Sequence, residues 1–252
     1  MPRVESLKGV GIKAYSNADK DRVPHDDWDD IKRRVERGGG EFGAADRANF
    51  PCPSRIGLFG PPGVGKTTTI ANILGAASPA YDELYVIHGD AQHSQEYDAL
   101  KPAAVLGDVP GVDFWRALPP ATKKGRPIRR MVVVDDLEVT RCPRQRLENL
   151  GILFRYVSTH LGITTIWAHQ SLFDTPSIIR KMLSVFVLWR PHSRQELTTA
   201  ENRVGLPSGV LTELFRDLCP THRDSICVDL SPGSPAKLRL NLYRKIDGVE
   251  DF

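Results

Sequence analysis

The segment that most constrains this chain is Gly60-Pro61-Pro62-Gly63-Val64-Gly65-Lys66-Thr67. An apolar run, Ile56–Phe59, precedes it, and a helical pattern, Lys66–Ala77, follows it. The segment matches G-x-x-x-x-G-K-[ST] in full, and a strand before it and a helix after it are the context that supports the motif. Glycines permit a tight loop whose backbone N–H groups converge on an anion. We therefore predict a phosphate-binding loop, in preference to a glycine-rich turn that binds no nucleotide.

The loop assigns a role to each of its polar residues. Lys66 is predicted to reach the β- and γ-phosphates of ATP, and Thr67 to ligate Mg²⁺. The amino end of the following helix adds positive potential. The predicted nucleotide contacts are Gly60, Pro61, Pro62, Gly63, Val64, Gly65, Lys66, Thr67 and Thr68.

Short apolar runs alternate with helical patterns downstream of Arg55. The predicted strands are Ile56–Phe59, Leu84–His88, Met131–Val134, Thr164–Ala168 and Val185–Leu188, and the predicted helices are Lys66–Ala77, Gln145–Thr159 and Ser177–Leu183. This alternation predicts an α/β fold with a mainly parallel sheet that helices cover on both faces. The proline-rich stretch Gly89–Pro127 lacks a clear period and is predicted as a loop or insertion.

The end of the chain has a different pattern. Two helical patterns, Gln195–Val204 and Ser208–Leu218, precede two strand-like runs, Ser225–Leu230 and Lys237–Tyr243. Turn residues separate the two runs, which predicts a C-terminal β-hairpin at the edge of the sheet.

Composition divides the chain into two parts. Residues 1–50 are polar, and one helix is predicted in them, Asp26–Arg37, with acids at its start and bases at its end. We expect an N-terminal arm, residues 1–50, and a P-loop motor domain, residues 51–252. No apolar run is long enough to span a membrane, so no membrane span is expected. The four cysteines form no CxxC pair, so a zinc site is not predicted.

Two carboxylates follow the apolar run that ends at Val134. Asp135 is predicted to hold Mg²⁺, and Asp136 to act as the base that polarises the attacking water. Glu138 is a rival base, although a solvated loop acid is the simpler interpretation. Gln170 follows the next predicted strand, which in P-loop ATPases with an inserted strand lies between the phosphate-loop strand and the aspartate strand. Gln170 is predicted to sense the γ-phosphate or to cap the strand end, and His169 is predicted to be structural.

The ordered motifs resemble the genome-packaging ATPases of double-stranded DNA viruses, within the FtsK–HerA superfamily, and most of all those of virophages and Polinton-like viruses, relatives of the poxvirus packaging ATPase. The resemblance spans about Arg55 to Ile246. It rests on Gly60–Thr67, Asp135-Asp136, Tyr156–His160, Ala168–Gln170, Glu96–Asp98, Val187–Trp189 and Asp224-Ser225. It implies a P-loop NTPase fold of the RecA-like (ASCE) type, a ring that is commonly a hexamer, DNA in a central channel, and an arginine finger from the neighbouring subunit.

The arginine finger is not fixed by a motif. The poxvirus-like pattern has Gly-Arg-His where this chain has Ser158-Thr159-His160, so Thr159 takes the place of the arginine. Arg155 lies one helical turn earlier and is the first candidate. Arg180 and Arg203 are rivals.

Local charge gives one candidate for DNA contact. The net charge of the chain is only +3. Residues 120–146, however, contain eight basic side chains and only three acidic ones. Lys123, Lys124, Arg126, Arg129 and Arg130 are therefore a predicted contact for the DNA backbone, and a solvated basic loop is the alternative.

These observations predict an ATPase that translocates double-stranded DNA into a preformed viral capsid. The partners expected are double-stranded DNA, further copies of the chain in a ring, and capsid proteins. The expected location is the host cytoplasm or nucleus where virions assemble, with association with the virion. Two alternatives stay open: another P-loop ATPase such as a helicase loader, and a nucleotide-dependent switch or scaffold with little turnover. An apparent strand pair at the C-terminus argues against the helical lid of the loaders, and Asp135, Asp136 and Gln170 disfavour the switch.

Overall fold

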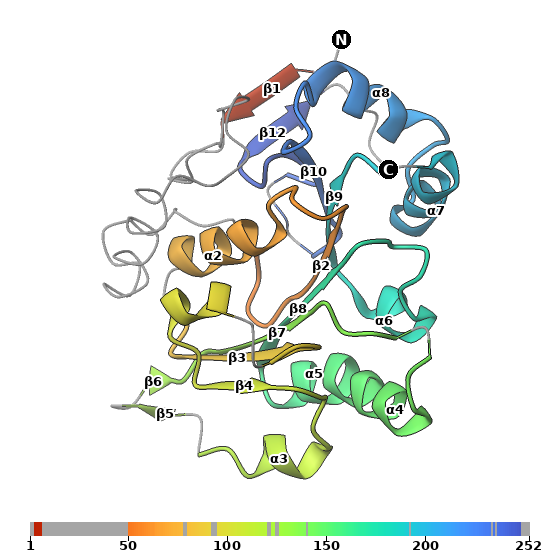
Figure 1. Cartoon of the computed structure of the whole chain (residues 1–252). Coiled ribbons are helices and arrows are strands. Elements are labelled where there is room, and N and C mark those ends of the chain that lie inside the picture. The colour runs from red at the N-terminus through yellow and green to blue at the C-terminus, as the bar shows by residue number, and fades with distance from the viewer. Residues whose placement is uncertain are drawn as a thin grey trace.

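A ten-stranded sheet runs through the chain in the order β1-β12-β11-β10-β9-β2-β8-β7-β3-β4 (Figure 1). The computed structural model describes residues 3–6, 50–77, 80–91, 95–119, 122–123, 126–139, 141–191, 193–232, 234 and 236–247. The strands are β1 (Arg3–Ser6), β2 (Arg55–Phe59), β3 (Glu83–His88), β4 (Ala104–Leu106), β7 (Arg130–Asp135), β8 (Ile163–His169), β9 (Val185–Trp189), β10 (Ser225–Asp229), β11 (Leu238–Leu240) and β12 (Arg244–Asp247).

The sheet has a parallel part and an antiparallel part. Strands β9, β2, β8, β7, β3 and β4 pair in parallel, whereas β10, β11, β12 and β1 continue the sheet from β9 in antiparallel pairs. The mainly parallel sheet predicted from the sequence is therefore confirmed. Strand β8 lies between β2 and β7, which is the inserted position expected for the strand before Gln170.

Helices cover both faces of the sheet, as predicted. One face packs against α2 (Lys66–Ala76) and the 3₁₀ helix η1 (Gln95–Leu100). The other packs against α3 (Val112–Arg116), α4 (Arg144–Ile152), the π-helix η2 (Leu153–Val157), α6 (Ser177–Met182), α7 (Arg194–Val204) and α8 (Val210–Leu218) (Figure 1). Alternation along β7 explains the two cores, because Met131 and Val133 join one of them and Val132 and Val134 join the other.

The sequence-based prediction is wrong about the stretch Gly89–Pro127. It contains η1, α3, the parallel edge strand β4 and a separate two-stranded hairpin, β5 (Thr122–Lys123) with β6 (Arg126–Pro127). These elements are too short for their periodicity to stand out, and prolines interrupt them. Burial of Tyr97 and Trp115 shows that tertiary packing holds them in place.

The C-terminal hairpin forms toward one end of the sheet, as predicted, and two further strands extend the sheet beyond it. Strands β10 and β11 pair antiparallel. The chain then turns at Asn241 and Leu242, both with positive φ, and adds β12. Strand β1, from the predicted N-terminal arm, pairs with β12 and is the outermost strand. The predicted helix Asp26–Arg37 lies outside the described residues.

The predicted helix Gln145–Thr159 is present with a local change of winding. Helix α4 passes into η2 and then into α5 (Ser158–His160), so that five residues have the wider π-helical turn. Such turns occur mostly as single bulges within α-helices and are frequent near functional sites. Arg155 lies within this π-helix.

Candidate active site

The phosphate-binding loop connects β2 to α2. Gly63 and Gly65 have φ of 79° and 101°, a left-handed conformation that residues with a β-carbon rarely adopt. Gly65 is the N-cap of α2, and its carbonyl accepts a hydrogen bond from the Thr69 N–H at 2.9 Å. The amino end of α2 therefore begins within the loop, where its unpaired N–H groups and dipole attract anions.

Lys66 lies across the loop. Its Nζ donates to the carbonyl oxygens of Gly60 at 2.7 Å and Pro61 at 3.0 Å. Burial lowers the pKa of Lys66, and the charges of Asp135 and Asp136 oppose that shift. The ammonium group thus contacts the loop and is under the electrostatic influence of the two carboxylates. Thr67 is half-buried, and Thr68 is buried.

Asp135 is the last residue of β7 and is buried beneath the surface of the site. Its Oδ2 accepts a hydrogen bond from the Tyr97 hydroxyl at 2.5 Å. Burial raises the pKa of the Asp135 carboxyl, while the hydrogen bond from Tyr97 counteracts the rise. Tyr97 itself has a strongly raised pKa, chiefly because it is buried, so it stays a hydroxyl and a donor.

Sequence reasoning gave Tyr97 no role of its own. Glu96-Tyr97-Asp98 was matched only as part of the resemblance, and a tyrosine within a predicted loop carries no signal of burial. The available sign was its position shortly after the strand that ends at His88, because that end meets the end of β7 in the parallel register His88–Asp135.

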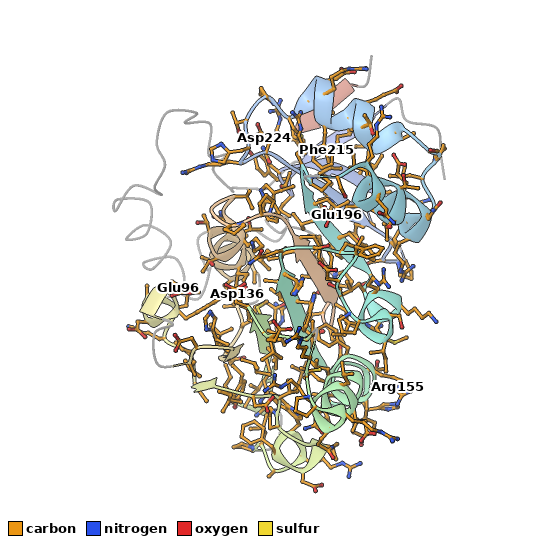
Figure 2. The ribbon with its side chains drawn as sticks, turned by 45° about the vertical axis from the view of Figure 1, so that its right-hand side comes forward. Glu96, Asp136, Arg155, Glu196, Phe215 and Asp224 are labelled. Carbon is orange, nitrogen blue, oxygen red and sulfur yellow. The ribbon has the colours of Figure 1, made fainter. Side chains whose placement is uncertain are left out.

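Asp136 differs from Asp135 in both backbone and exposure. Its φ is 48°, in the left-handed region, and its side chain is exposed. Figure 2 shows Asp136 and Glu96, a residue of η1, on the same side of the molecule. An exposed carboxylate therefore directly follows a buried one at the end of β7. Glu138, the rival base, is also exposed, and its carbonyl accepts a hydrogen bond from Arg146.

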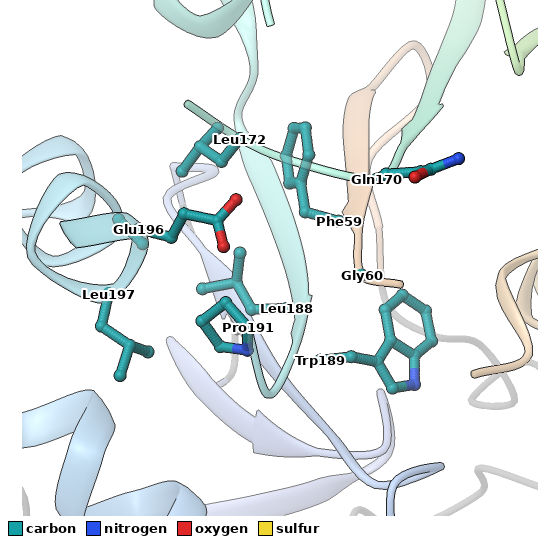
Figure 3. A pocket seen from close by; sticks show the side chains of 10 residues that line it. Phe59, Gly60, Gln170, Leu172, Leu188, Trp189, Pro191, Glu196 and Leu197 are labelled. Atoms are coloured by element: carbon teal, nitrogen blue, oxygen red, sulfur yellow. The ribbon is translucent and has the colours of Figure 1, made fainter. Parts of the chain in front are cut away.

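Gln170 lies at the end of β8, next to the phosphate-binding loop. The Gly60 N–H donates to the His169 carbonyl at 3.3 Å, which ties the loop to the residue before Gln170. A pocket beside this point is lined by Phe59, Gly60, Gln170, Leu172, Leu188, Trp189, Pro191, Glu196, Leu197 and Ala200 (Figure 3). The His169 ring stacks on Trp167, in keeping with the structural role predicted for it. Lys66, Asp135 and Gln170 thus meet at the carboxyl ends of three neighbouring strands.

The three candidate arginine fingers have different surroundings. Arg155 is exposed on η2, and Figure 2 shows it on the helix at the lower right, whereas Asp136 lies near the centre. Arg203 donates to the carbonyl oxygens of Arg180, Lys181 and Leu183 and lies over the Phe186 ring. The guanidinium of Arg203 therefore caps the carboxyl end of α6 within its own chain, and Arg203 is a poor candidate finger. Arg180 is half-buried on α6.

The basic cluster is only partly a surface feature. Arg130 is 5% exposed, and its Nε donates to Glu83 Oε2 at 2.6 Å. The prediction that Arg130 contacts DNA is therefore wrong, because an internal ion pair uses its charge. Arg129 lies over the Tyr81 ring at 4.6 Å. The side chains of Lys123 and Arg126, and all of Lys124, lie outside the described residues.

Solved structures match the fold. The crystal structure of B204, the DNA-packaging ATPase from Sulfolobus turreted icosahedral virus, gives a TM-score of 0.52 at 15% identity, over 79% of this chain and 98% of that chain. The fold is that of a P-loop ATPase. The pCW3 conjugation coupling protein TcpA, in its monomer form with ATPγS, gives a TM-score of 0.52 at 14% identity, over 75% of this chain and 59% of that one.

A third solved structure extends the similarity. The cytoplasmic domain of the Thermomonospora curvata type VII secretion ATPase EccC gives a TM-score of 0.50 at 14% identity, over 82% of this chain and 26% of that chain. No protein-family profile and no curated protein sequence matches this chain. At such identities the three structures establish the fold, and the roles of individual residues rest on the geometry above.

The donor set fits Mg²⁺. Thr67 and Asp135 offer a hydroxyl and a carboxylate, the hard oxygen ligands that Mg²⁺ accepts alongside phosphate oxygens and water. The Tyr97 hydroxyl is hydrogen-bonded to Asp135 and neighbours Thr67, so both predicted ligands lie around one point. Among the described residues, no helix is both long and apolar enough to cross a membrane.

Proposed function

We propose that this chain is an ATP-hydrolysing translocase of double-stranded DNA that packages a viral genome into a preformed capsid. The observation that carries the ATPase part is the convergence of Lys66, Asp135 and Gln170 at the carboxyl ends of β2, β7 and β8. Hydrolysis at a γ-phosphate needs a loop that binds the phosphates, a carboxylate that binds a metal ion, and a polar group beside the loop.

Each residue has a defined part in this proposal. The backbone N–H groups of residues 60–67 and the Lys66 ammonium bind and orient the phosphates. Lys66 then donates to phosphate oxygens instead of the Gly60 and Pro61 carbonyl oxygens. Thr67 and Asp135 hold Mg²⁺, which neutralises phosphate charge when bound. Asp136 accepts a proton from the attacking water, and Gln170 donates a hydrogen bond to the γ-phosphate or to that water. Arg155 of a neighbouring subunit completes the site.

The DNA-packaging part has separate support. B204 is a DNA-packaging ATPase, and the matched region spans 98% of its length, so the likeness extends beyond a shared phosphate-binding loop. The motifs that resemble the FtsK–HerA packaging ATPases add to this support. We propose a ring, with a hexamer as the first expectation, with DNA in its channel and capsid proteins as partners at the site of virion assembly.

The rival functions lack a comparable observation. A helicase loader usually has a helical lid after its core, whereas this sheet continues through antiparallel β10, β11 and β12. A switch that scarcely hydrolyses ATP does not require both an exposed and a buried carboxylate beside Lys66.

The test is ATP turnover by the full chain with and without duplex DNA, on protein whose mass in solution has been measured. We expect turnover that duplex DNA stimulates, and loss of that turnover in Lys66→Ala. Equal turnover by wild type and Lys66→Ala would overturn the ATPase proposal. Turnover that duplex DNA leaves unchanged, together with no DNA binding at low salt, would overturn the translocase proposal and leave the ATPase proposal standing.

A second experiment addresses the DNA contact. Replacing Lys123, Lys124 and Arg126 together by Ala is expected to lower DNA-stimulated turnover and to spare basal turnover. Because backbone contacts release counterions, the same variant should show a weaker dependence of DNA binding on salt. Arg129→Ala, tested separately, shows whether an arginine that packs on Tyr81 contributes to the same contact.

A further inference from the structure

The hydroxyl of Tyr97 lies at the point where the two predicted magnesium ligands meet. It donates to Asp135 Oδ2 at 2.5 Å, and the Thr67 side chain is a second hydrogen-bonding neighbour of the Tyr97 hydroxyl. The Tyr97 side chain is fully buried. One phenol therefore contacts a residue of the phosphate-binding loop and the carboxylate at the end of β7.

The structure fixes Tyr97 in this position from several sides. It belongs to η1, and its ring packs in the hydrophobic core that α2 forms with the sheet. The His88 ring lies edge-on to the Tyr97 ring, with 6.4 Å between the ring centroids. His88 Nε2 lies 3.7 Å from Glu96 Oε1. The core and the His88 ring thus surround the phenol, and its hydroxyl is directed at the Asp135 carboxylate.

We propose that Tyr97 is a positioning residue for the magnesium site, and that its hydroxyl fixes the rotamer of Asp135 so that the remaining carboxylate oxygen faces the metal. The inference rests on the proposed function, because it needs a bound nucleotide and Mg²⁺. Partners of this kind, which orient a ligand without touching the metal, commonly change metal affinity or activity by about 10- to 100-fold when removed.

A purely structural contact is the competing explanation. A buried carboxylate needs a hydrogen-bond donor wherever it lies, and a tyrosine can satisfy that need without a metal. The two explanations differ in what they predict for nucleotide binding. A structural contact affects folding stability alone, whereas a positioning contact affects the magnesium dependence of binding.

The experiment compares wild type with Tyr97→Phe, which removes the hydroxyl and keeps the ring. The probe is a fluorescent, slowly hydrolysed ATP analogue, titrated onto the full chain in EDTA and then at increasing Mg²⁺. We expect similar affinities in EDTA and a half-saturating Mg²⁺ concentration raised about 10-fold in the variant. Mn²⁺ in place of Mg²⁺, followed by its paramagnetic resonance signal, measures metal binding without turnover.

Two controls distinguish a positioning effect of the Tyr97 hydroxyl on the magnesium site from a general effect of losing a hydroxyl in the core. Tyr85→Phe removes a buried tyrosine hydroxyl that also bonds a carboxylate, Glu83 at 3.0 Å, and is expected to leave the Mg²⁺ titration unchanged. Tyr97→Phe in the Asp135→Asn background is expected to add little further change, because the two residues act through one contact. Thermal unfolding of each variant checks that the fold is retained.

The outcomes are distinguishable. Superimposable Mg²⁺ titrations of wild type and Tyr97→Phe overturn the inference and leave the proposed function intact. An equal shift in Tyr85→Phe overturns it as well, since the effect is then not local. If the wild type binds the analogue without any magnesium dependence, both the inference and the proposed magnesium site fail.

Discussion

The Asp136 carbonyl oxygen packs directly against the Gly89 backbone, so that a β-carbon at position 89 would lie only 2.6 Å from it. Gly89 directly follows β3, and Asp136 directly follows β7. The two turns therefore stack at the carboxyl ends of β3 and β7, where Asp135 and Asp136 emerge. Only glycine allows this approach without displacing the backbone that carries Asp136.

Gly89→Ala is expected to impair turnover more than binding. The added methyl pushes the Asp136 peptide away, and a displacement of about 1 Å in a reacting group can cost up to about 100-fold in kcat. Nucleotide affinity should change little, because the phosphate-binding loop lies on other strands. The measurement is kcat and KM for ATP. Gly107→Ala is the control, since its β-carbon would meet only Ala91 at 3.9 Å, and a kcat loss as large there would argue against the local explanation.

Gln170→Ala is expected to lower kcat and to spare nucleotide affinity. Gln170 is exposed and follows the residue whose carbonyl accepts the Gly60 N–H, so its amide lies beside the loop without supporting the core. Loss of one donor to a developing charge costs on the order of 100-fold in kcat. Gln145→Ala removes an exposed amide that bonds only within α4, to Asn149, and serves as the control. Unchanged turnover in Gln170→Ala would assign Gln170 to capping the strand end.

The sequence was sufficient to predict the central part of the fold. The strands around the phosphate-binding loop carry short, mainly apolar runs, and β2, β7, β8 and β9 formed within one residue of the predicted bounds. The inserted position of β8, and hence the placement of Gln170, was expected by analogy with P-loop ATPases that have an inserted strand, and the pairing of β8 with β2 and β7 agrees with it.

The rest depended on tertiary contacts that no local pattern encodes. Strands β1, β4 and β12 are three or four residues long, too short for alternation to identify them. The sequence alone suggests that Arg130 and Arg203 are surface residues. In the structure, Arg130 pairs with Glu83 and Arg203 caps the carboxyl end of α6. Tyr97 could not be recognised as a partner of Asp135 before the packing of η1 was known.

We expect replacement of Arg155 to affect turnover and replacement of Arg203 to affect stability. Arg155→Ala is expected to lower turnover by about 1000-fold, the lower range for loss of an arginine finger, with no change in thermal stability. Arg203→Ala removes hydrogen bonds to three carbonyl oxygens and is expected to lower the free energy of unfolding by about 1 kcal/mol.

Mixing experiments test whether Arg155 acts between subunits. Arg155→Ala subunits keep their own phosphate-binding loop, and Lys66→Ala subunits keep their own arginine. A mixture of the two variants should therefore recover part of the turnover that each lacks alone. No recovery in mixed oligomers would contradict a finger at Arg155 and direct attention to Arg180.

The ion pair between Arg130 and Glu83 predicts a pH dependence of stability. The hydrogen bond from Arg130 is the main cause that lowers the pKa of Glu83 below its ordinary value of 4.5. A lowered folded-state pKa means that the pair stabilises the fold fully above that ordinary value. Its contribution is lost as the pH falls through the folded-state pKa.

Glu83→Gln is expected to lower the free energy of unfolding by about 2 kcal/mol at pH 7, because it leaves the buried Arg130 charge without its partner. The difference from wild type should shrink as the pH falls below 4.5, where Glu83 in the unfolded chain takes up a proton while the folded carboxyl still resists it. Urea unfolding of both proteins at pH 7, 5 and 3.5 measures this difference in the free energy of unfolding. A difference that stays constant over this range would mean that the charge of Glu83 contributes nothing.

The four cysteines should differ sharply in reactivity. Cys52 is exposed and Cys142 is half-buried, whereas Cys219 and Cys227 are buried. Burial raises the pKa of both Cys219 and Cys227 to about 12, so at pH 8 neither offers an appreciable amount of thiolate, the reactive form. Cys227 lies within β10, and its side chain joins the buried core on one face of the sheet, so a reagent reaches it only when that core opens.

Labelling of the native chain with a thiol reagent at pH 8 is therefore expected to modify Cys52 rapidly and Cys142 more slowly. Cys219 and Cys227 should react only at the rate of global unfolding, and all four should react in denaturant. Peptide mass mapping over time assigns each rate. Cys52→Ser should remove the fast phase and leave the slow ones unchanged. Rapid labelling of Cys227 in the native chain would contradict its burial in the core that covers this face of the sheet, because its sulfur is exposed only when that core opens.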